Sequence, residues 1–306
     1  MTLLPFRAGR RVAYTLGALL VVPAFLTSAV TFAAPPGSTP DQVAKHDDKE
    51  YTIARTFKAK DVNHYKMSVT TSIDNPQFGN IDVVATMVYK ETTKEVKDNG
   101  SAVLTSEFDS ASVNVAGMDR DIASSLPTIT TTVDKQGHVL DTKMEGGDPS
   151  VTQQMSMGAL GNMGQQSFFP GKPIKVGDTW KIDSPAKDKK SAKVTGTATL
   201  IGTDTINGIL TLKIKTVTDS EISMENPTKA GEMLNVKAHA EGVTNIDVAT
   251  GKMVKMTMSS TGDSGALGKS KSDITVTLVP ADDKTKEGAK PGDAKKSPDK
   301  ADKPKE

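Results

Sequence analysis

The chain has no cysteine. This absence excludes disulfide bonds, thiolate metal sites, a cysteine nucleophile and a lipid-modified cysteine behind a leader. Aromatic residues are scarce, at 4% of the chain with a single tryptophan. Aliphatic side chains and methionine must therefore supply most of any buried core.

The sequence also lacks the patterns that mark common catalytic and metal sites. Only four histidines occur, and no His-x-His or His-x-x-x-His spacing and no Gly-x-Ser-x-Gly motif is present. We therefore predict no catalytic site, no metal site and no cofactor. The histidines are His46, His64, His138 and His239.

Neither sign of charge is in excess. The 38 basic and 37 acidic residues give a formal net charge of +1. Loss of the leader described next, with its three arginines, changes this to −2. The balance gives no electrostatic reason to expect a nucleic acid partner.

The N-terminus has the three parts of a secretory signal peptide. Arg7, Arg10 and Arg11 are followed by an uncharged apolar run and then by small residues before Pro35. We predict cleavage after Ala33, which makes residues 1–33 the leader and the protein exported, periplasmic or extracellular. The alternative is an uncleaved anchor, which would give the protein its one contact with a membrane.

Both flanks of the mature chain are poor in large apolar residues. Residues 34–49 are predicted to be a flexible lead-in, and residues 281–306 a disordered tail of alternating charge. Burial cannot offset the entropy of ordering such segments. The remaining residues 50–280 are predicted to form a β-rich domain.

Within this domain the dominant hydrophobic period is two residues. Apolar side chains alternate with threonine, serine and lysine over 51–57, 65–73, 81–89, 210–216 and 274–278. This pattern is typical of antiparallel strands with one wet face, and tight hairpins are expected at Asn99-Gly100 and Asn207-Gly208. The fold class predicted is mainly β, with one or more antiparallel curved sheets.

One segment departs from the strand pattern. Asp148 can cap a helix that has Pro149 in its first turn, and we predict a short amphipathic helix over about 149–165. If the protein binds a ligand, the candidate binding residues are the apolar side chains of this segment: Met155, Leu160 and Met163.

Two stretches of the chain resemble each other. The Asp134 to His138 turn and the Asp247 to Lys252 turn each open with aspartate and include a glycine, Gly137 and Gly251. Further signals recur in the same order at similar offsets. We predict tandem repeats over about 51–144 and 176–279, joined by the helical segment.

Residues 170–180 contain the pattern Pro-x-x-Pro-x-x-x-Gly-Asp-x-Trp, from Pro170 to Trp180. This segment resembles one that recurs in uncharacterised exported bacterial β-rich proteins, and the resemblance implies exported β structure without a known activity. At the level of architecture, a duplicated sheet over a helix is similar to the lipoprotein-carrier half-barrels of the bacterial envelope, which hold acyl chains.

Two further patterns have alternative interpretations. Asp119-Arg120-Asp121 is either a cation or sugar contact or a solvated loop, and we favour the loop. Met253-x-x-Met256-x-Met258 resembles a thioether copper ligand set, but alternation on one strand face favours a hydrophobic role.

These observations favour an exported non-enzymatic envelope protein, either a structural scaffold or a binder of an apolar or lipid ligand. Its partner would be that ligand or another envelope protein. The alternatives are a hydrolase with dispersed carboxylates and a protein-interaction module.

Overall fold

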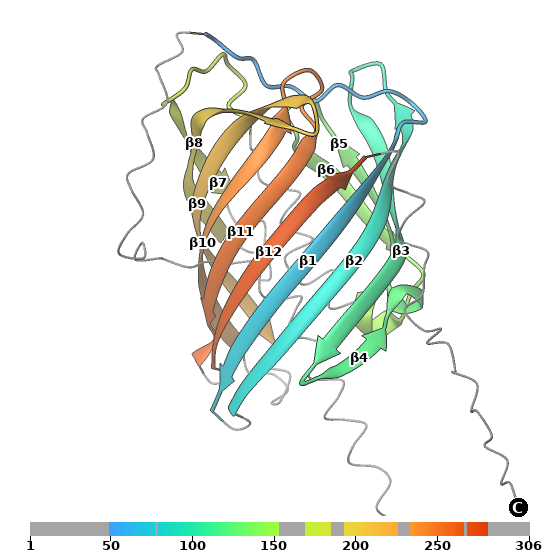
Figure 1. Ribbon diagram of the computed structural model, residues 1–306, viewed down its shortest axis with the longest axis vertical. Helices are drawn as coiled ribbons and strands as arrows, with labels where there is room; N and C mark the ends of the chain where they lie inside the picture. The colour runs from blue at the N-terminus through green and yellow to red at the C-terminus, as the bar shows by residue number, and fades with distance from the viewer. Residues whose placement is uncertain are drawn as a thin grey trace, which may run out of the picture.

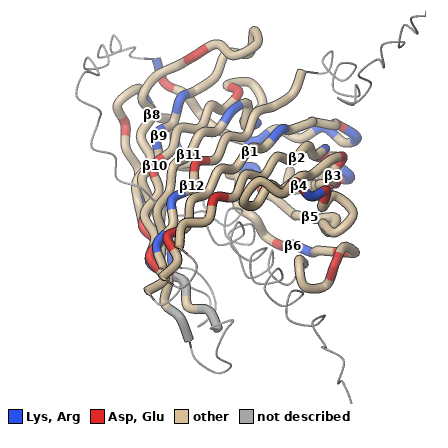
Figure 2. The backbone as a smooth tube through the Cα atoms, turned by 60° about the horizontal axis from the view of Figure 1, so that its bottom comes forward, with Lys and Arg blue, Asp and Glu red and all other residues tan. Residues whose placement is uncertain are grey.

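The described part of the chain is one antiparallel β-sheet. The computed structural model describes residues 49–76, 79–152, 169–184, 193–225, 233–265 and 268–280. The sheet has twelve strands and curves strongly, as Figures 1 and 2 show. The strands are β1 (Val62–Asn75), β2 (Gly79–Val96), β3 (Ala102–Val115), β4 (Met118–Asp121), β5 (Thr128–Val133), β6 (Val139–Glu145), β7 (Thr179–Ser184), β8 (Lys193–Ile206), β9 (Ile209–Glu225), β10 (Met233–Asp247), β11 (Met253–Asp263) and β12 (Lys269–Val279).

The order across the sheet is β6-β5-β3-β2-β1-β12-β11-β10-β9-β8-β7, with β4 paired to β3 alone. Strands β1 to β6 thus form one half of the sheet, and β7 to β11 form the other half. In both halves the strand numbers fall along the order from the β6 edge to the β7 edge. The last strand, β12, lies between β1 and β11 and joins the halves. A duplicated meander would give this order, and the duplication itself stays a prediction.

The alternation predicted from the sequence is confirmed on the central strand. In β1, Tyr65, Val69 and Ile73 are buried, whereas Lys66 and Thr70 on the other face are exposed. Along β1 from Tyr65 to Ile73, apolar side chains therefore face the concave side, whereas charged and polar side chains other than Thr71 face the convex side. The mainly β fold class is confirmed.

Two buried hydroxyl groups on the concave side are satisfied by each other within the sheet. Thr71 is fully buried, and its hydroxyl forms a hydrogen bond of 2.8 Å with the hydroxyl of Ser272 on the neighbouring strand β12. Such pairing removes the cost of burying the two hydroxyl groups and joins the two halves at their seam.

Both expected hairpins are present. Asn207 and Gly208 both have positive φ, 50° and 79°, between β8 and β9. Such a pair suits a two-residue turn between twisted strands. Gly100 has a φ of 79° in the longer turn between β2 and β3. Ala116 and Gly117 make another hairpin, between β3 and β4, that the residue types did not indicate.

The alternation over residues 51–57 does not produce a strand, so this part of the prediction is wrong. Only Tyr51 makes a bridge, to Ile174, and residues 49–61 instead cross the ends of several hairpins. We call residues 49–61 the crossing segment; Figure 1 shows its first residues in blue at the top of the sheet. Its backbone N–H groups donate to carbonyls on different hairpins, such as those of Lys135 and Thr250. Because these partners do not lie on one strand, no ladder forms.

The predicted helix begins as expected. Residues 149–152 are helical, and an oxygen of the Asp148 carboxylate accepts hydrogen bonds from the backbone N–H groups of Ser150 at 2.8 Å and Val151 at 3.4 Å. A hydrogen bond from the Ser150 hydroxyl, together with these two backbone bonds, lowers the pKa of Asp148. Residues 153–168 lie outside the described residues, as do the leader, residues 34–48 of the lead-in and the tail. A membrane-spanning helix is not found in the described ranges.

Candidate functional site

The concave face of the sheet carries an apolar surface built mainly from β1, β2, β11 and β12. Its buried members form one cluster, and partly buried side chains pack against it. The buried members include Tyr65, Val69, Ile73, Val83, Ala85, Val113, Met256, Ile274 and Val276. Within the described ranges the sheet is a single layer, with no second sheet stacked on this face.

Methionine is concentrated on this face. Met67, Met87, Met253 and Met258 are partly buried against the cluster, and Met256 is part of it. The unbranched thioether side chain adapts to irregular apolar surroundings. The packing supports the hydrophobic interpretation of these methionines.

A second apolar cluster lies across β7 to β10. The crossing segment contributes Tyr51 and Ile53, and the loop before β7 contributes Phe169 and Ile174. They pack against fully buried strand residues such as Leu200. Trp180 lies on β7 and packs against this cluster as an aromatic anchor. Hydrogen bonds of 2.8 and 2.9 Å between Tyr51 and Ile174 fix the loop to the crossing segment.

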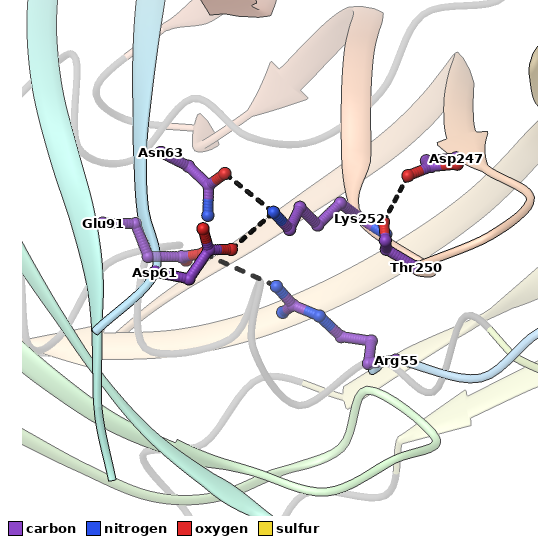
Figure 3. Close-up of polar contacts among 7 residues, drawn as sticks. All are labelled: Arg55, Asp61, Asn63, Glu91, Asp247, Thr250 and Lys252. Atoms are coloured by element: carbon purple, nitrogen blue, oxygen red, sulfur yellow. Dashed lines mark hydrogen bonds and ion pairs between the residues drawn. The ribbon is translucent and has the colours of Figure 1, made fainter. Parts of the chain in front are cut away.

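The hairpin end of the concave face holds a network of charged side chains, shown in Figure 3. The Lys252 ammonium donates hydrogen bonds to Asp61 Oδ2 at 2.6 Å and to Asn63 Oδ1 at 2.9 Å. Beside them, the Arg55 guanidinium lies 3.5 Å from Glu91. Each of these two cations is therefore matched by a carboxylate.

The network changes the pKa values of its neighbours. The hydrogen bond and charge of Lys252 lower the pKa of Asp61 against a smaller opposing effect of burial. Tyr65 and Tyr89 stack at 5.3 Å between ring centroids, next to the network. Burial raises the pKa of both phenols, and the nearby Glu91 carboxylate raises it further. Both tyrosines are therefore neutral over the physiological pH range.

The crossing segment ties the two matched hairpins together. Arg55 N–H donates to the carbonyl of Lys135 at 2.7 Å, and Thr56 N–H donates to the carbonyl of Thr250 at 2.9 Å. Lys135 and Thr250 belong to the two turns that resemble each other in sequence. Consecutive residues of the crossing segment thus bind two hairpins, one from each half of the sheet.

The histidines in the described ranges do not converge. Each pairs with an aspartate instead: His64 with Asp109 at 3.4 Å, His138 with Asp134 at 2.6 Å, and His239 with Asp219 at 2.7 Å. No group of three or more histidine or carboxylate side chains suited to a metal ion occurs in the described part of the chain. His46 lies outside it.

The candidate ligand residues from the sequence, Met155, Leu160 and Met163, lie outside the described residues. The structure therefore leaves them as predictions. Asp119-Arg120-Asp121 forms the exposed strand β4, where Asp119 accepts a hydrogen bond from Asn114 and Asp121 accepts one from the Ala123 N–H. These bonds are typical of a solvated hairpin.

The convex face carries a charged hollow of about 480 Å³ over β9 to β12. Glu221, Lys237, Asp263 and Lys269 follow one another across these strands with alternating sign. Figure 2 shows acidic and basic residues gathered near these strand ends. Lys237 and Glu221 lie 3.5 Å apart with most of their surface in solvent. Exposed pairs of this kind contribute little binding energy, and the hollow is a weaker candidate than the concave face.

Sequence reasoning missed the network around Lys252. Its members come from the crossing segment, β1, β2 and the turn before β11, and 191 positions separate Lys252 from Asp61. The two matched turns were found from their aspartate and glycine residues. Nothing in their local pattern indicated that the crossing segment would bring Asp61 to Lys252.

Comparisons with known proteins give remote similarities to solved structures. No family model and no curated protein matches the chain. Lipovitellin, solved in a study of its lipid–protein interactions, is 10% identical with a TM-score of 0.46, over 73% of this chain and 25% of that chain. The chain thus spans a quarter of the length of that relative.

Two smaller proteins are also similar. A Bacteroides fragilis protein with a YmcC-like fold, provisionally described as exported, is 9% identical with a TM-score of 0.27, over 75% of this chain and 100% of that one. DynF from the dynemicin pathway of Micromonospora chersina is 9% identical with a TM-score of 0.21, over 84% and 98%. At these values function must be argued from the chain's own residues.

Proposed function

We propose that this protein is an exported, non-enzymatic binder of an apolar ligand, a lipid or another acyl chain, held along the concave face of the sheet. The observation that carries the proposal is the apolar, methionine-rich concave face of a sheet that is single-layered in its described part. A sheet with one apolar face needs a second layer to cover it. The buried members of this cluster are already covered, and a bound apolar ligand would contact the partly buried side chains packed against them, such as Met67, Met87 and Met258.

The width of the sheet supports this assignment. Rolled sheets of about eight strands are just filled by their own side chains or hold one small ligand, and the interior widens as strands are added. This sheet has twelve strands. Strands β2 and β12 also carry short side chains on the concave face, Ala85 and Ser272, which leave more room than leucine would.

The charged network argues for an apolar rather than an ionic ligand. Lys252 is paired with Asp61, and Arg55 lies beside Glu91, so both cations already have a carboxylate partner. An anionic ligand would have to displace a carboxylate already bound at 2.6 Å. The methionine side chains instead suit flexible chains of variable shape.

Native mass spectrometry of the protein purified gently from its own cell envelope tests the proposal. The expected result is a reproducible added mass that is lost on solvent extraction and is identified as lipid. A bare polypeptide mass in repeated preparations, together with no uptake of a fluorescent fatty acid by the extracted protein, would overturn the proposal.

A matched pair of variants locates the ligand. Met258 faces the concave side of β11 and packs against the apolar cluster, whereas its neighbour Thr257 is exposed on the convex side. Met258→Lys places an ammonium group in the apolar surface and is expected to reduce bound lipid to background, because burying an unpaired charge is costly. Thr257→Lys is expected to leave it unchanged. Equal lipid content in two folded variants would exclude the concave face.

A further inference from the structure

The strand order determines how the two edges of the sheet can pair. Strands β6 and β7 end the order, and every pairing between them is antiparallel. The path contains an odd number of strands, so β6 and β7 run in the same direction. Closing the sheet within one chain would thus require a parallel pair, which does not fit an otherwise antiparallel ladder. An edge can pair antiparallel with the same edge of a second copy.

The two edges differ in how well they are protected. In β6 the register shifts next to Val139, which leaves Leu140 out of the ladder, and this side chain is 56% exposed. Irregularities of this kind protect an edge from further pairing. Strand β7 pairs with β8 in regular register over its whole length, from Thr179 to Ser184.

Among registers centred on Lys181, Ile182 or Asp183, the side chains of β7 favour one for pairing with a copy of itself. Lys181 and Asp183 are exposed on the convex face, and Ile182 between them lies on the concave face. When a two-fold axis relates two copies of β7, the concave side chains of both copies must lie on the same side of the joined sheet. Residues opposite each other must therefore come from the same face, and this holds only if the axis passes through the position of one residue rather than between two. Centring on Lys181 or Asp183 places like charges opposite each other. Centring on Ile182 places Lys181 opposite Asp183 twice.

We propose that β7 is a dimerisation edge, at which two copies of this chain pair antiparallel about Ile182. The contact is isologous and closes after two copies, because each β7 edge is used once. It would extend the sheet through both molecules, with the two concave faces on the same side. This inference stands independently of the proposed ligand, since it uses the sheet edge and the convex charges alone.

Charge reversal with rescue tests the proposal. Sedimentation equilibrium of the purified protein over a wide concentration range is expected to show a monomer–dimer equilibrium that weakens with salt. Lys181→Asp and Asp183→Lys each create two like-charge contacts and should each raise the dimer dissociation constant by roughly tenfold or more. The double variant Lys181→Asp/Asp183→Lys restores opposite charges and should restore the wild-type constant.

The other edge supplies the control. Asp141→Lys on β6 makes an equally large change of charge on an exposed edge residue and should leave the dimer unchanged. All four variants change exposed residues, and circular dichroism checks that each remains folded. A wild-type protein that stays monomeric, or a dimer that the single reversals do not weaken or the double variant does not restore, would overturn the proposal.

Discussion

Gly251 is the residue at which the contact between the crossing segment and the sheet can be measured most directly. Its φ is +66°, and a Cβ built on it would lie 2.3 Å from the carbonyl oxygen of Ala54. Gly251→Ala therefore has two costs. An L-residue in the left-handed region costs about 1–2 kcal/mol, and displacing a packed backbone costs about 1–3 kcal/mol more.

Gly208→Ala is the matched control. Gly208 has a similar φ of +79° in another hairpin, but no atom lies within 4 Å of the position that a Cβ would occupy there. Only the conformational cost of about 1–2 kcal/mol should apply to this variant. Urea unfolding of both variants measures the free energy of unfolding, with equal m-values as a check on the denatured state. If Gly251→Ala destabilises the protein no more than Gly208→Ala, the crossing segment does not contribute to stability as described.

Two further predictions concern packing and charge. Leu200→Ala removes a side chain with no exposed surface and should lower the free energy of unfolding by about 2–5 kcal/mol. Its control is Leu210→Ala, at a position that is 46% exposed, which should cost well under about 1 kcal/mol. Chemical denaturation measures the free energy of unfolding of both variants. Lys252→Met removes the partner that lowers the pKa of Asp61, and we expect a loss of up to about 1 kcal/mol near neutral pH, since Asp61 is only partly buried. Because the pKa of Asp61 in the folded protein lies below 3.8, the loss of stability should be complete above pH 3.8 and should vanish as the pH falls through that folded pKa. A difference in the free energy of unfolding between wild type and variant that persists at low pH would contradict the assignment.

The crossing segment explains why the two halves of the sheet form one unit at their hairpin end. Arg55 and Thr56 bind hairpins from different halves, and Asp61 binds Lys252. At the centre, β1 and β12 pair over eleven residues and share the buried Thr71–Ser272 hydrogen bond. The halves are therefore joined by the sheet in the middle and by the crossing segment at the end.

The sequence by itself determined the mainly β fold class and the strand structure over 65–73, 81–89, 210–216 and 274–278. Alternation such as that of Tyr65, Val69 and Ile73 reports which face of a strand is buried, and this is a local property with a fixed period. Asn207-Gly208 and the Asp148 cap were also predictable, because each satisfies its own backbone within a few residues. The same rule misassigned residues 51–57, since a segment crossing hairpin ends can bury alternate side chains without forming a ladder.

Only the tertiary structure decided how these elements combine. No local pattern places β12 between β1 and β11, because strand pairing at this distance depends on the packing of the whole sheet. The Lys252–Asp61 pair and the exposed β7 edge follow from that order and have no sequence signature of their own. Local residue types fix periodicity, turns and caps, whereas contacts between distant residues exist only after the chain has closed on itself.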